Sequence, residues 1–571
     1  MTKNAQVARI LKEIGLLLQL EGANSFRVSA YSRAVRAITS LGEDIEVVAK
    51  RGALTDIKGI GKGLSGLITS YLTTGKVEEL EELRTRVPIR VLELDSVPGL
   101  GPKKIKVLFD ELGVTDLQSL EKVAKNDRIA ELPGFSDKSQ TQILDGIQVV
   151  RAGMERTLLA DAIVVAEEIE AKLRKLPEVK QIAIAGSTRR RRETIGDLDL
   201  LVDATNSEPI MDAFVNFAGV KTIIAHGPTK SSVRLETGLQ IDLRVIPAES
   251  FGAGLQYFTG SVDHNVRLRA IAQKKNLRLN EYGLLKKKKS VAGEDEEGIY
   301  ETLGLQWVPP ELRENQGEIE AAQAGNLPNL IEIKNIRGDL HSHTDQSDGT
   351  NTIEEMLDAA QAKRYKYYCV SDHTQSLTIA NGMDESRLLK RIDEIDDLNA
   401  SGRWKMKILK GAEVDILAKG GLDIVDDVLA QLDVVTGSVH SRMKDNKKVM
   451  TERVCHALEN KHIHILGHPT GRLIGKRSEF EIDLEQVFEV AKDHNVVMEL
   501  NAHPQRLDLN AGNLRAATKL GLKIAINTDA HKIPELDNMR YGVYQARRGW
   551  LSPKDVINTF TLKKLMTVLS K

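Results

Sequence analysis

The segment YKYYCVSDH (365–373) is a short apolar run that stops at an acid and an imidazole, and the same pattern recurs through the C-terminal part of the chain. The runs alternate with polar stretches of helical character, which predicts strands alternating with helices. Parallel strands of a β/α barrel end at one rim, so the polar residues that follow successive strands meet there. We therefore expect a β/α barrel with a polar rim. The other runs are MKILKGAEVD (406–415), LDVVTGSVH (432–440), IHILGHP (463–469), VVMELNAH (496–503) and KIAINTDAH (523–531).

Acidic and imidazole side chains at this rim are candidate metal ligands. Neutral imidazoles and carboxylates suit zinc, manganese or iron, and the set is larger than one tetrahedral ion can use. We therefore predict two or three divalent ions (Mn²⁺, Zn²⁺ or Fe²⁺). A single histidine at a strand end is often only a hydrogen-bonded core residue, but this set takes six of the 13 histidines of the chain. The candidates are His341, His343, Asp348, His373, Glu413, His440, His468, Asp529 and His531.

The spacing of these residues resembles the metal-binding pattern of the polymerase and histidinol phosphatase (PHP) domain family. The resemblance extends over residues 335–571 and fills every position of that pattern. It implies a distorted (β/α)7 barrel whose metal cluster hydrolyses phosphoesters. Such ions polarise a phosphate, lower the pKa of a bound water and stabilise the leaving oxygen. Asn501 and His503 follow the VVMEL run and are expected to contact substrate rather than metal.

The composition is that of an ordinary multidomain protein. The chain has 571 residues, of which 41% are hydrophobic and 28% charged, and its net charge is −1. This length predicts about four domains. The sequence has no apolar run long enough to span a bilayer, and its two cysteines, Cys369 and Cys455, are too few for a disulfide framework. We expect a monomer in the cytoplasm, associated with the nucleoid and with no membrane partner.

Charge is unevenly distributed along the chain. Basic blocks at residues 189–192 and 266–289 are offset in the total by acidic segments elsewhere. Local fields rather than the net charge decide whether a surface attracts phosphate. The two blocks therefore favour an anionic partner, although many such runs are only solvated faces.

Three glycine-rich turns repeat in the first 150 residues, each between amphipathic helical stretches: IKGIGKG (57–63), VPGLGPKK (97–104) and LPGFSDKS (132–139). Glycine adopts backbone angles barred to other residues and lets the N–H groups of the next helix approach a phosphate. One copy could be an ordinary helix C-cap, but two full copies and a partial one, with Ser136 in place of the second glycine, favour helix-hairpin-helix DNA binding without base readout. The candidate DNA-binding glycines are Gly59, Gly61, Gly63, Gly99 and Gly101.

A second chemical centre is predicted in AIAGSTRRRRETIGDLDLLV (183–202). Asp197 and Asp199 are two residues apart on a predicted strand, so both carboxylates point to one face. Adjacent anions in apolar surroundings are costly unless a cation lies between them. Asp242, alone in the apolar run LQIDLRVIP (239–247), can join them from a neighbouring strand. Three carboxylates holding Mg²⁺ or Mn²⁺ suit the activation of a sugar 3′-hydroxyl and the binding of triphosphate oxygens.

These motifs, together with YFTGSVDHNVRLRAIA (257–272) and LNEYGL (279–284), resemble the family X DNA polymerases, the group that contains polymerase beta. The resemblance implies that Asp197, Asp199 and Asp242 are the metal-binding catalytic residues. It also implies nucleotide binding at Gly186, Ser187, Arg190, Tyr257, Phe258, Gly260 and Asn265, and DNA binding at Arg244 and Arg269.

The N-terminal segments NSFRVSAYSRAVRAI (24–38) and GIGKGLSGLITSYLTTGKVEELEEL (59–83) resemble the lyase domain of polymerase beta. The lysine that forms the Schiff base in that domain aligns with Leu67, which cannot attack a sugar aldehyde. We therefore expect no lyase chemistry through this residue. Arg27, Tyr31 and Lys62 are expected to help hold a 5′-phosphate at a gap.

The two resemblances together cover nearly the whole chain, in the order of the bacterial and archaeal family X polymerases with a C-terminal PHP domain. The predicted fold class is multidomain α+β and α/β. The predicted domains are a helical lyase-like domain (1–84), helix-hairpin-helix fingers (85–155), a nucleotidyltransferase palm (156–250), a thumb (251–315), a linker (316–334) and a PHP barrel (335–571).

The predicted function is a repair polymerase that fills short gaps, using deoxynucleoside triphosphates on gapped or primed DNA. The PHP barrel is expected to act as a metal-dependent 3′-5′ exonuclease or phosphoesterase, with abasic-site endonuclease activity as a further expectation. Two alternatives stay open: a phosphatase or pyrophosphatase for small phosphoesters whose front half tethers it to DNA, and a non-catalytic protein that bridges DNA ends.

Overall fold

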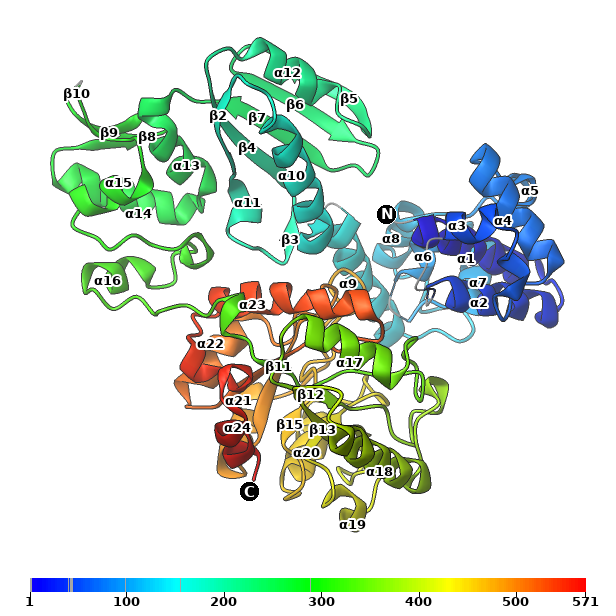
Figure 1. The fold of residues 1–571 in the computed structure, drawn as a ribbon. Helices are drawn as coiled ribbons and strands as arrows, with labels where there is room; N and C mark the ends of the chain where they lie inside the picture. Colours follow the sequence, from blue (N-terminus) through cyan, green and yellow to red (C-terminus); the bar gives the residue numbers. More distant parts are fainter. Residues whose placement is uncertain are drawn as a thin grey trace.

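Four regions follow one another along the chain in Figure 1: a helical region, a sheet covered by helices, a small mixed region and a barrel. The computed structural model describes residues 3–39, 41, 45–97, 99–154, 156–287 and 289–570. Lys288 of the predicted basic block lies outside these ranges. No helix within them is both long and apolar enough to cross a bilayer.

The helices of the N-terminal region share one hydrophobic core. Leu11, Leu80 and Ile105 belong to the same buried cluster, so residues from both predicted N-terminal domains pack together. Gly59 and Gly99 have φ angles of 102° and 83°, which favour glycine, and each precedes a helix. The helices are α1 (Lys3–Glu21), α2 (Ser25–Thr39), α3 (Ile45–Lys50), α4 (Lys62–Thr74), α5 (Glu78–Arg86), α6 (Val91–Asp95), α7 (Pro102–Leu112), α8 (Leu117–Lys125) and α9 (Asp137–Met154).

The palm region is a five-stranded sheet with strand order β2-β4-β7-β6-β5, in which β4 and β7 are parallel and the other neighbours antiparallel. Leu198 and Leu200 of β4 pack with Ile163 and Phe214 from two helices on one face. Because side chains alternate along a strand, Asp197 and Asp199 point to the opposite face. The elements are β1 (Thr157–Leu158), α10 (Leu159–Leu173), β2 (Val179–Ile184), α11 (Gly186–Arg189), β3 (Thr194–Ile195), β4 (Asp197–Ala204), α12 (Glu208–Val215), β5 (Val220–His226), β6 (Lys230–Leu235) and β7 (Gln240–Val245).

The thumb region is joined to the palm by a buried charge cluster. Arg313 donates to both oxygens of Glu296 at 2.6 and 3.1 Å, and Arg189 of the palm donates to the same oxygens at 2.8 and 2.7 Å. Buried charges persist only when they are paired in this way. The elements are α13 (Phe251–Thr259), α14 (Val262–Lys274), β8 (Arg278–Asn280), β9 (Gly283–Lys286), β10 (Lys289–Ala292), α15 (Glu296–Thr302) and α16 (Glu318–Gln323).

The predicted linker begins with α16, which packs on α14. Glu318 is fully buried and lies 2.6 Å from His264 Nδ1, and Ile319 belongs to the thumb core. The domain boundary at residue 316 stays a prediction, but the first part of the linker has contacts typical of the thumb.

The C-terminal region is a nearly closed barrel of seven parallel strands in sequential order, which confirms the predicted fold. A bridge between Ser342 and Ala530 brings the first and last strand ends together. The two cysteines of the barrel are buried and free. Its elements are β11 (Gly338–Asp339), α17 (Ile353–Ala362), β12 (Tyr367–Val370), α18 (Glu385–Ser401), β13 (Lys407–Asp415), α19 (Asp426–Leu429), β14 (Val434–Ser438), α20 (Lys447–Leu458), β15 (Ile465–Leu466), α21 (Leu484–Asp493), β16 (Val497–Asn501), α22 (Ala511–Lys519), β17 (Ile524–Asn527), α23 (Met539–Arg548) and α24 (Leu562–Leu569).

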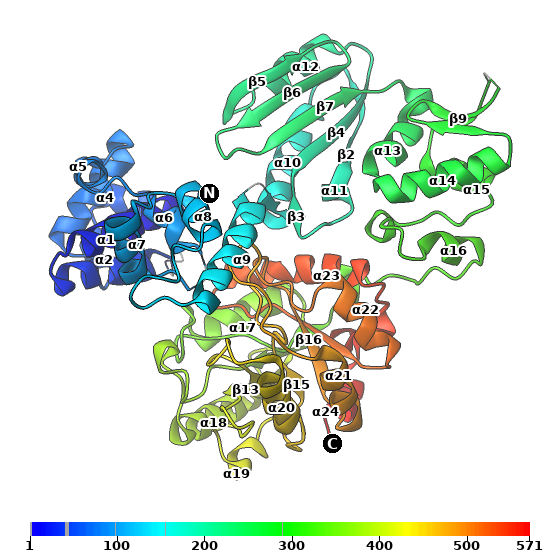
Figure 2. The same ribbon diagram turned by 180° about the vertical axis from the view of Figure 1, so that it is seen from behind.

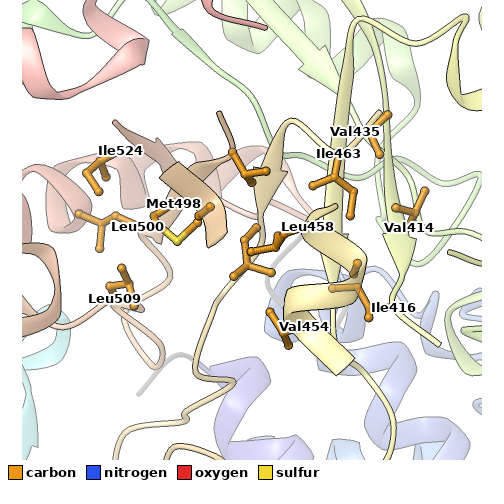
Figure 3. Packing of buried hydrophobic residues seen from close by; sticks show 14 of the residues in the cluster. Val414, Ile416, Val435, Val454, Leu458, Ile463, Met498, Leu500, Leu509 and Ile524 are labelled. Atoms are coloured by element: carbon orange, nitrogen blue, oxygen red, sulfur yellow. The ribbon is translucent and has the colours of Figure 1, made fainter. Parts of the chain in front are cut away.

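The core of the barrel lies between its strands and the surrounding helices. Figure 3 shows Leu458 and Val454 of α20 facing Val435, Ile463 and Met498. Figure 2 shows α23 on the side of the barrel that meets the palm. The palm and the barrel therefore share an interface.

Leu458→Ala is expected to destabilise the barrel by about 2–5 kcal/mol, because it leaves a cavity in a packed core. Leu458 is fully buried, whereas Val449 on the same helix is 37% exposed. Val449→Ala, the matched control, is expected to change the free energy of unfolding by less than about 0.5 kcal/mol. Urea unfolding followed by circular dichroism measures both, and equal losses would contradict the packing described for α20.

Candidate metal centre and nucleotide cleft

The barrel rim brings the predicted metal ligands together. Three overlapping groups of ligand atoms each lie within 4.8 Å of one another, and these groups contain eight of the nine residues. The ninth, His468, has its Nε2 atom 3.0 Å from Glu413 Oε1. The groups are His343, Asp348, His373 and His531; His341, His343, Glu413 and Asp529; and His373, Glu413 and His440.

Glu413 lies at the centre of this cluster. It is 1% exposed, and its Oε2 atom lies 2.9 Å from His373 Nδ1 and 3.3 Å from His341 Nε2. Its Oε1 atom lies 3.4 Å from His440 Nε2. A carboxylate with imidazoles around both oxygens is suited to bridge two cations.

The electrostatics of the rim fit divalent cations. Burial, and then the neighbouring His531 and His373, lower the pKa of His343 to about 4, so this imidazole is neutral at pH 7. His341 Nε2 and Glu413 Oε2 are buried and hydrogen bonded to no described residue. Buried polar atoms in this state are rare in folded proteins, and a cation between them would satisfy both.

Two acidic residues behind the ligands were not predicted. His341 Nδ1 donates to Glu499 at 2.7 Å, and Glu499 also accepts from the backbone N–H of His468 at 2.6 Å. His440 Nδ1 donates to Asp415 at 3.2 Å. Such partners fix the orientation of a ligating imidazole. The signal in the sequence is an acid inside an otherwise apolar run, as in VVMEL and AEVD.

Asn501 is fully buried, and its amide donates to Asp529 Oδ2 at 2.9 Å, so it orients a candidate ligand. Its contact with substrate stays a prediction. His503 lies at the same strand end, where its Nδ1 accepts from the backbone N–H of Gln505 at 3.3 Å.

The palm places the three predicted aspartates on neighbouring strands. Asp199 of β4 and Asp242 of β7 are register partners, and Asp197 is two residues earlier on the same face. Gly186 follows β2 with φ +62°, and a Cβ there would overlap the Asp199 carboxylate. Glycine is therefore required where the loop crosses the acidic pair. This arrangement is looser than the barrel rim, since the groups within 4.8 Å among the described residues all lie in the barrel.

The charges of these aspartates raise the affinity of the palm for cations. Burial, and then repulsion from Asp197 and Asp242, raise the pKa of Asp199 to about 7. Burial opposes ionisation of Asp242 too, but hydrogen bonds from Lys230 and Ser232 lower its pKa below the usual range. Lys230 Nζ lies 2.6 Å from Asp242 Oδ2. A divalent cation between Asp197 and Asp199 would favour their ionised forms.

A cleft of about 620 Å³ adjoins Asp197 and Asp199, and it gathers the predicted nucleotide-binding residues. Asn265 is tied within the cleft wall, because it donates to Tyr257 O at 2.8 Å and accepts from Gln256 at 2.6 Å. Arg244 lies over the Phe258 ring at 4.6 Å. The predicted residues that line the cleft are Gly186, Ser187, Arg190, Asp197, Asp199, Tyr257, Phe258, Gly260, Asn265 and Arg269.

The basic block at residues 189–192 makes contacts within the protein. Arg190 lines the cleft, yet its guanidinium donates to the Thr259 carbonyl and lies 3.2 Å from Glu314. Arg192 lies 3.5 Å from Glu314, and Arg191 lies over the Tyr544 ring. The block therefore fastens the palm to the thumb and the barrel, a role that its charge alone did not predict.

In the helical region, Lys62, Gly61 and Gly63 are exposed at the start of α4. Leu67 packs against the hydrophobic core. Arg27 and Tyr31 both bind Glu79, at 2.5 and 2.8 Å. The first turn of α4 is thus open to a ligand. Arg27 and Tyr31, two of the predicted 5′-phosphate partners, are instead hydrogen bonded to Glu79.

Comparison with known proteins identifies the family. The chain is 39% identical over 572 aligned residues to the DNA polymerase/3′-5′ exonuclease PolX of Bacillus subtilis, and the match covers 99% of each chain. The chain belongs to the family X DNA polymerases that carry a PHP domain. Within this family X chain, residues 2–77 match a helix-hairpin-helix domain, 91–148 a helix-hairpin-helix tandem, 254–314 the DNA polymerase beta thumb and 339–503 the PHP domain.

Two other relatives each match part of this family X polymerase. DNA polymerase lambda of Arabidopsis thaliana is 27% identical over 326 residues, which cover 50% of this chain and 58% of the relative. A probable phosphatase of Thermoanaerobacter sp. (strain X514) is 27% identical over 233 residues, which cover 39% of this chain and 89% of the relative.

Glu499→Gln is expected to weaken metal binding at the barrel rim by about 10–100-fold, because the neutral amide no longer holds His341 in its ligating orientation. Titration of the metal-free protein with Mn²⁺, followed by calorimetry, measures the affinity. Glu489→Gln, at an exposed position on α21, is the matched control and should bind Mn²⁺ like the wild type. An unchanged affinity in Glu499→Gln would show that this carboxylate does not support the site.

Proposed function

We propose that this protein fills short gaps in DNA during repair by adding deoxynucleotides to a 3′-hydroxyl, and that its barrel removes 3′-terminal nucleotides. The observation that carries the proposal is the presence of two separate ligand-rich sites in one chain, one in the palm and one at the barrel rim. The full-length similarity to PolX supports the same assignment. We further propose that the protein acts as a cytoplasmic monomer on nucleoid DNA.

In the polymerase reaction, Asp197, Asp199 and Asp242 would hold Mg²⁺ or Mn²⁺. Such ions activate the 3′-hydroxyl and stabilise the charge on the triphosphate. Backbone N–H groups at Gly186 and Ser187 begin α11 and would donate to the triphosphate oxygens. Tyr257 and Phe258, whose rings meet edge to face at 5.1 Å, would form the wall against which the sugar packs.

DNA would be held by contacts that do not read its sequence. The turns at Gly59 and Gly99 precede helices whose N-cap residues, Gly61 and Gly101, make no side-chain cap, and the N–H groups of the first helical turns would bind backbone phosphates. Arg244 and Arg269, next to the aspartates and in the cleft wall, would bind the primer and the template strand. Phosphate contacts of this kind position a gap without selecting a sequence.

In the barrel, the nine rim residues would hold two or three divalent ions, with Mn²⁺, Zn²⁺ and Fe²⁺ as candidates. Bound ions of this kind supply a nucleophile and stabilise the leaving oxygen. Asp348, whose side chain is 35% exposed, and His531, at 30%, are the ligands nearest to solvent. We infer that a 3′-terminal phosphodiester enters from their side, and we extend the proposal to abasic-site cleavage at the same site.

A second candidate is a phosphatase for small phosphoesters whose front half tethers it to DNA. The similarity of 39% of this chain to a probable phosphatase of Thermoanaerobacter favours this activity. The two proposals differ in substrate: a single-stranded 3′ end should be hydrolysed faster than a free nucleoside monophosphate if the barrel acts as an exonuclease. A non-catalytic bridging protein would do neither.

Separate substitutions in the two sites test the proposal. Asp197→Ala should abolish primer extension on a gapped duplex and leave removal of 3′-terminal nucleotides intact, because only the palm loses a cation ligand. His341→Ala should have the reverse effect. Gel analysis of the same labelled duplex, with and without deoxynucleoside triphosphates, measures both activities. Loss of both activities in either variant would mean that the two reactions share one site.

A further inference from the structure

The polymerase cleft is connected to the barrel by the segment of residues 186–196, which joins Gly186 and Ser187 to Asp197. Glu193 in this segment accepts hydrogen bonds from Arg472 of the barrel at 2.6 and 3.2 Å, one to each oxygen. Gln545 of α23 donates to the same carboxylate at 2.5 Å. Bidentate arginine–carboxylate pairs fix the orientation of the two side chains as well as the distance between them. The barrel therefore holds the Glu193 carboxylate in a defined orientation.

The residues before Glu193 are held by the same helix of the barrel. Arg548 of α23 donates to the backbone carbonyl of Arg190 at 2.8 Å, and the guanidinium of Arg191 lies 4.3 Å from the centre of the Tyr544 ring. Arg191 itself has φ +56°, a left-handed conformation that L-residues rarely adopt. Such a conformation persists where the surroundings hold it, and here Arg548 and Tyr544 of α23 do so.

The anchor on the barrel side is itself rigid. The Arg472 side chain is 11% exposed and also donates to the Leu507 carbonyl at 2.5 Å. It is four residues after the candidate ligand His468, and Thr470 between them is bonded twice to Asp508. Leu507 and Tyr541 of the barrel are buried in the hydrophobic cluster of the palm. The contact with Glu193 thus comes from a fixed part of the barrel.

We propose that the barrel is part of the polymerase machinery: Arg472 and Gln545 are positioning residues that act through Glu193 to hold residues 186–196 in the geometry that binds the incoming deoxynucleoside triphosphate. The inference rests on the proposed nucleotide-binding role of this segment. It assigns the barrel a structural role in nucleotide addition that is separate from its own hydrolytic chemistry. Loosening the anchor would weaken triphosphate binding while the aspartates stay in place on β4 and β7.

Steady-state primer extension by the full-length protein tests this inference. Glu193→Ala is expected to raise the KM for deoxynucleoside triphosphate at least about fivefold, the lower end of typical coupling between sites, with kcat changed less than about twofold. Arg472→Ala should do the same. The double variant should show no further rise, because both substitutions remove one interaction and their effects are then non-additive. An unchanged KM in Glu193→Ala would overturn the inference.

Glu167→Ala provides the matched control. Glu167 of α10 pairs with Arg540 of α23 at 2.5 Å across the same interface, but neither residue belongs to the nucleotide segment. Its KM should equal that of the wild type, and an equal rise would mean that general loosening of the interface is the cause. Gln545→Ala is a milder change and should raise KM less than Glu193→Ala. It provides the test if Glu193→Ala does not fold. An unchanged KM in Gln545→Ala would also overturn the inference. Failure of the wild type to extend primers would instead overturn the proposed function.

Discussion

Burying a carboxylate is unfavourable unless a cation compensates its charge, and the organisation of this protein depends on that constraint. Glu413 is buried among imidazoles at the barrel rim, and Asp199 is next to two other aspartates in the palm. Between the domains, Glu193, Glu314 and Glu296 each receive arginines. The first two groups keep room for divalent ions, whereas the third is neutralised by side chains alone.

Parallel strands produce both candidate sites. Side chains at the ends of parallel strands converge on one edge of a sheet, so residues distant in sequence become neighbours. In the barrel all strands are parallel, and nine candidate ligands meet at one rim. In the palm only β4 and β7 are parallel neighbours, and this pair carries Asp199 and Asp242 in register. The palm site therefore depends on strand register, since Asp197 is the first residue of β4 and Asp242 lies within β7.

The palm and the barrel are joined by buried apolar side chains and by ion pairs. Tyr541 and Leu507 are buried in the palm core, and α23 supplies arginines to Glu167, Glu311 and Glu314. Apolar burial provides the driving force for this contact, while paired charges fix its register. The proposed positioning of residues 186–196 by the barrel gives the fusion of the two regions in one chain a structural reason as well as a functional one.

The sequence by itself determined the fold class, the order of the regions and most of the candidate ligands, because strand periodicity and short motifs place Asp197, Asp199 and His341 without reference to distant residues. It did not reveal Glu499 or Asp415, whose function is visible only from the imidazoles they orient. The sequence also predicted that the basic residues 189–192 bind an anionic partner. In the structure Arg189, Arg190 and Arg191 of this block contact the thumb or the barrel. Only the tertiary structure decided these pairings, because the partner of a charged side chain is set by which distant elements the fold brings within a few ångströms.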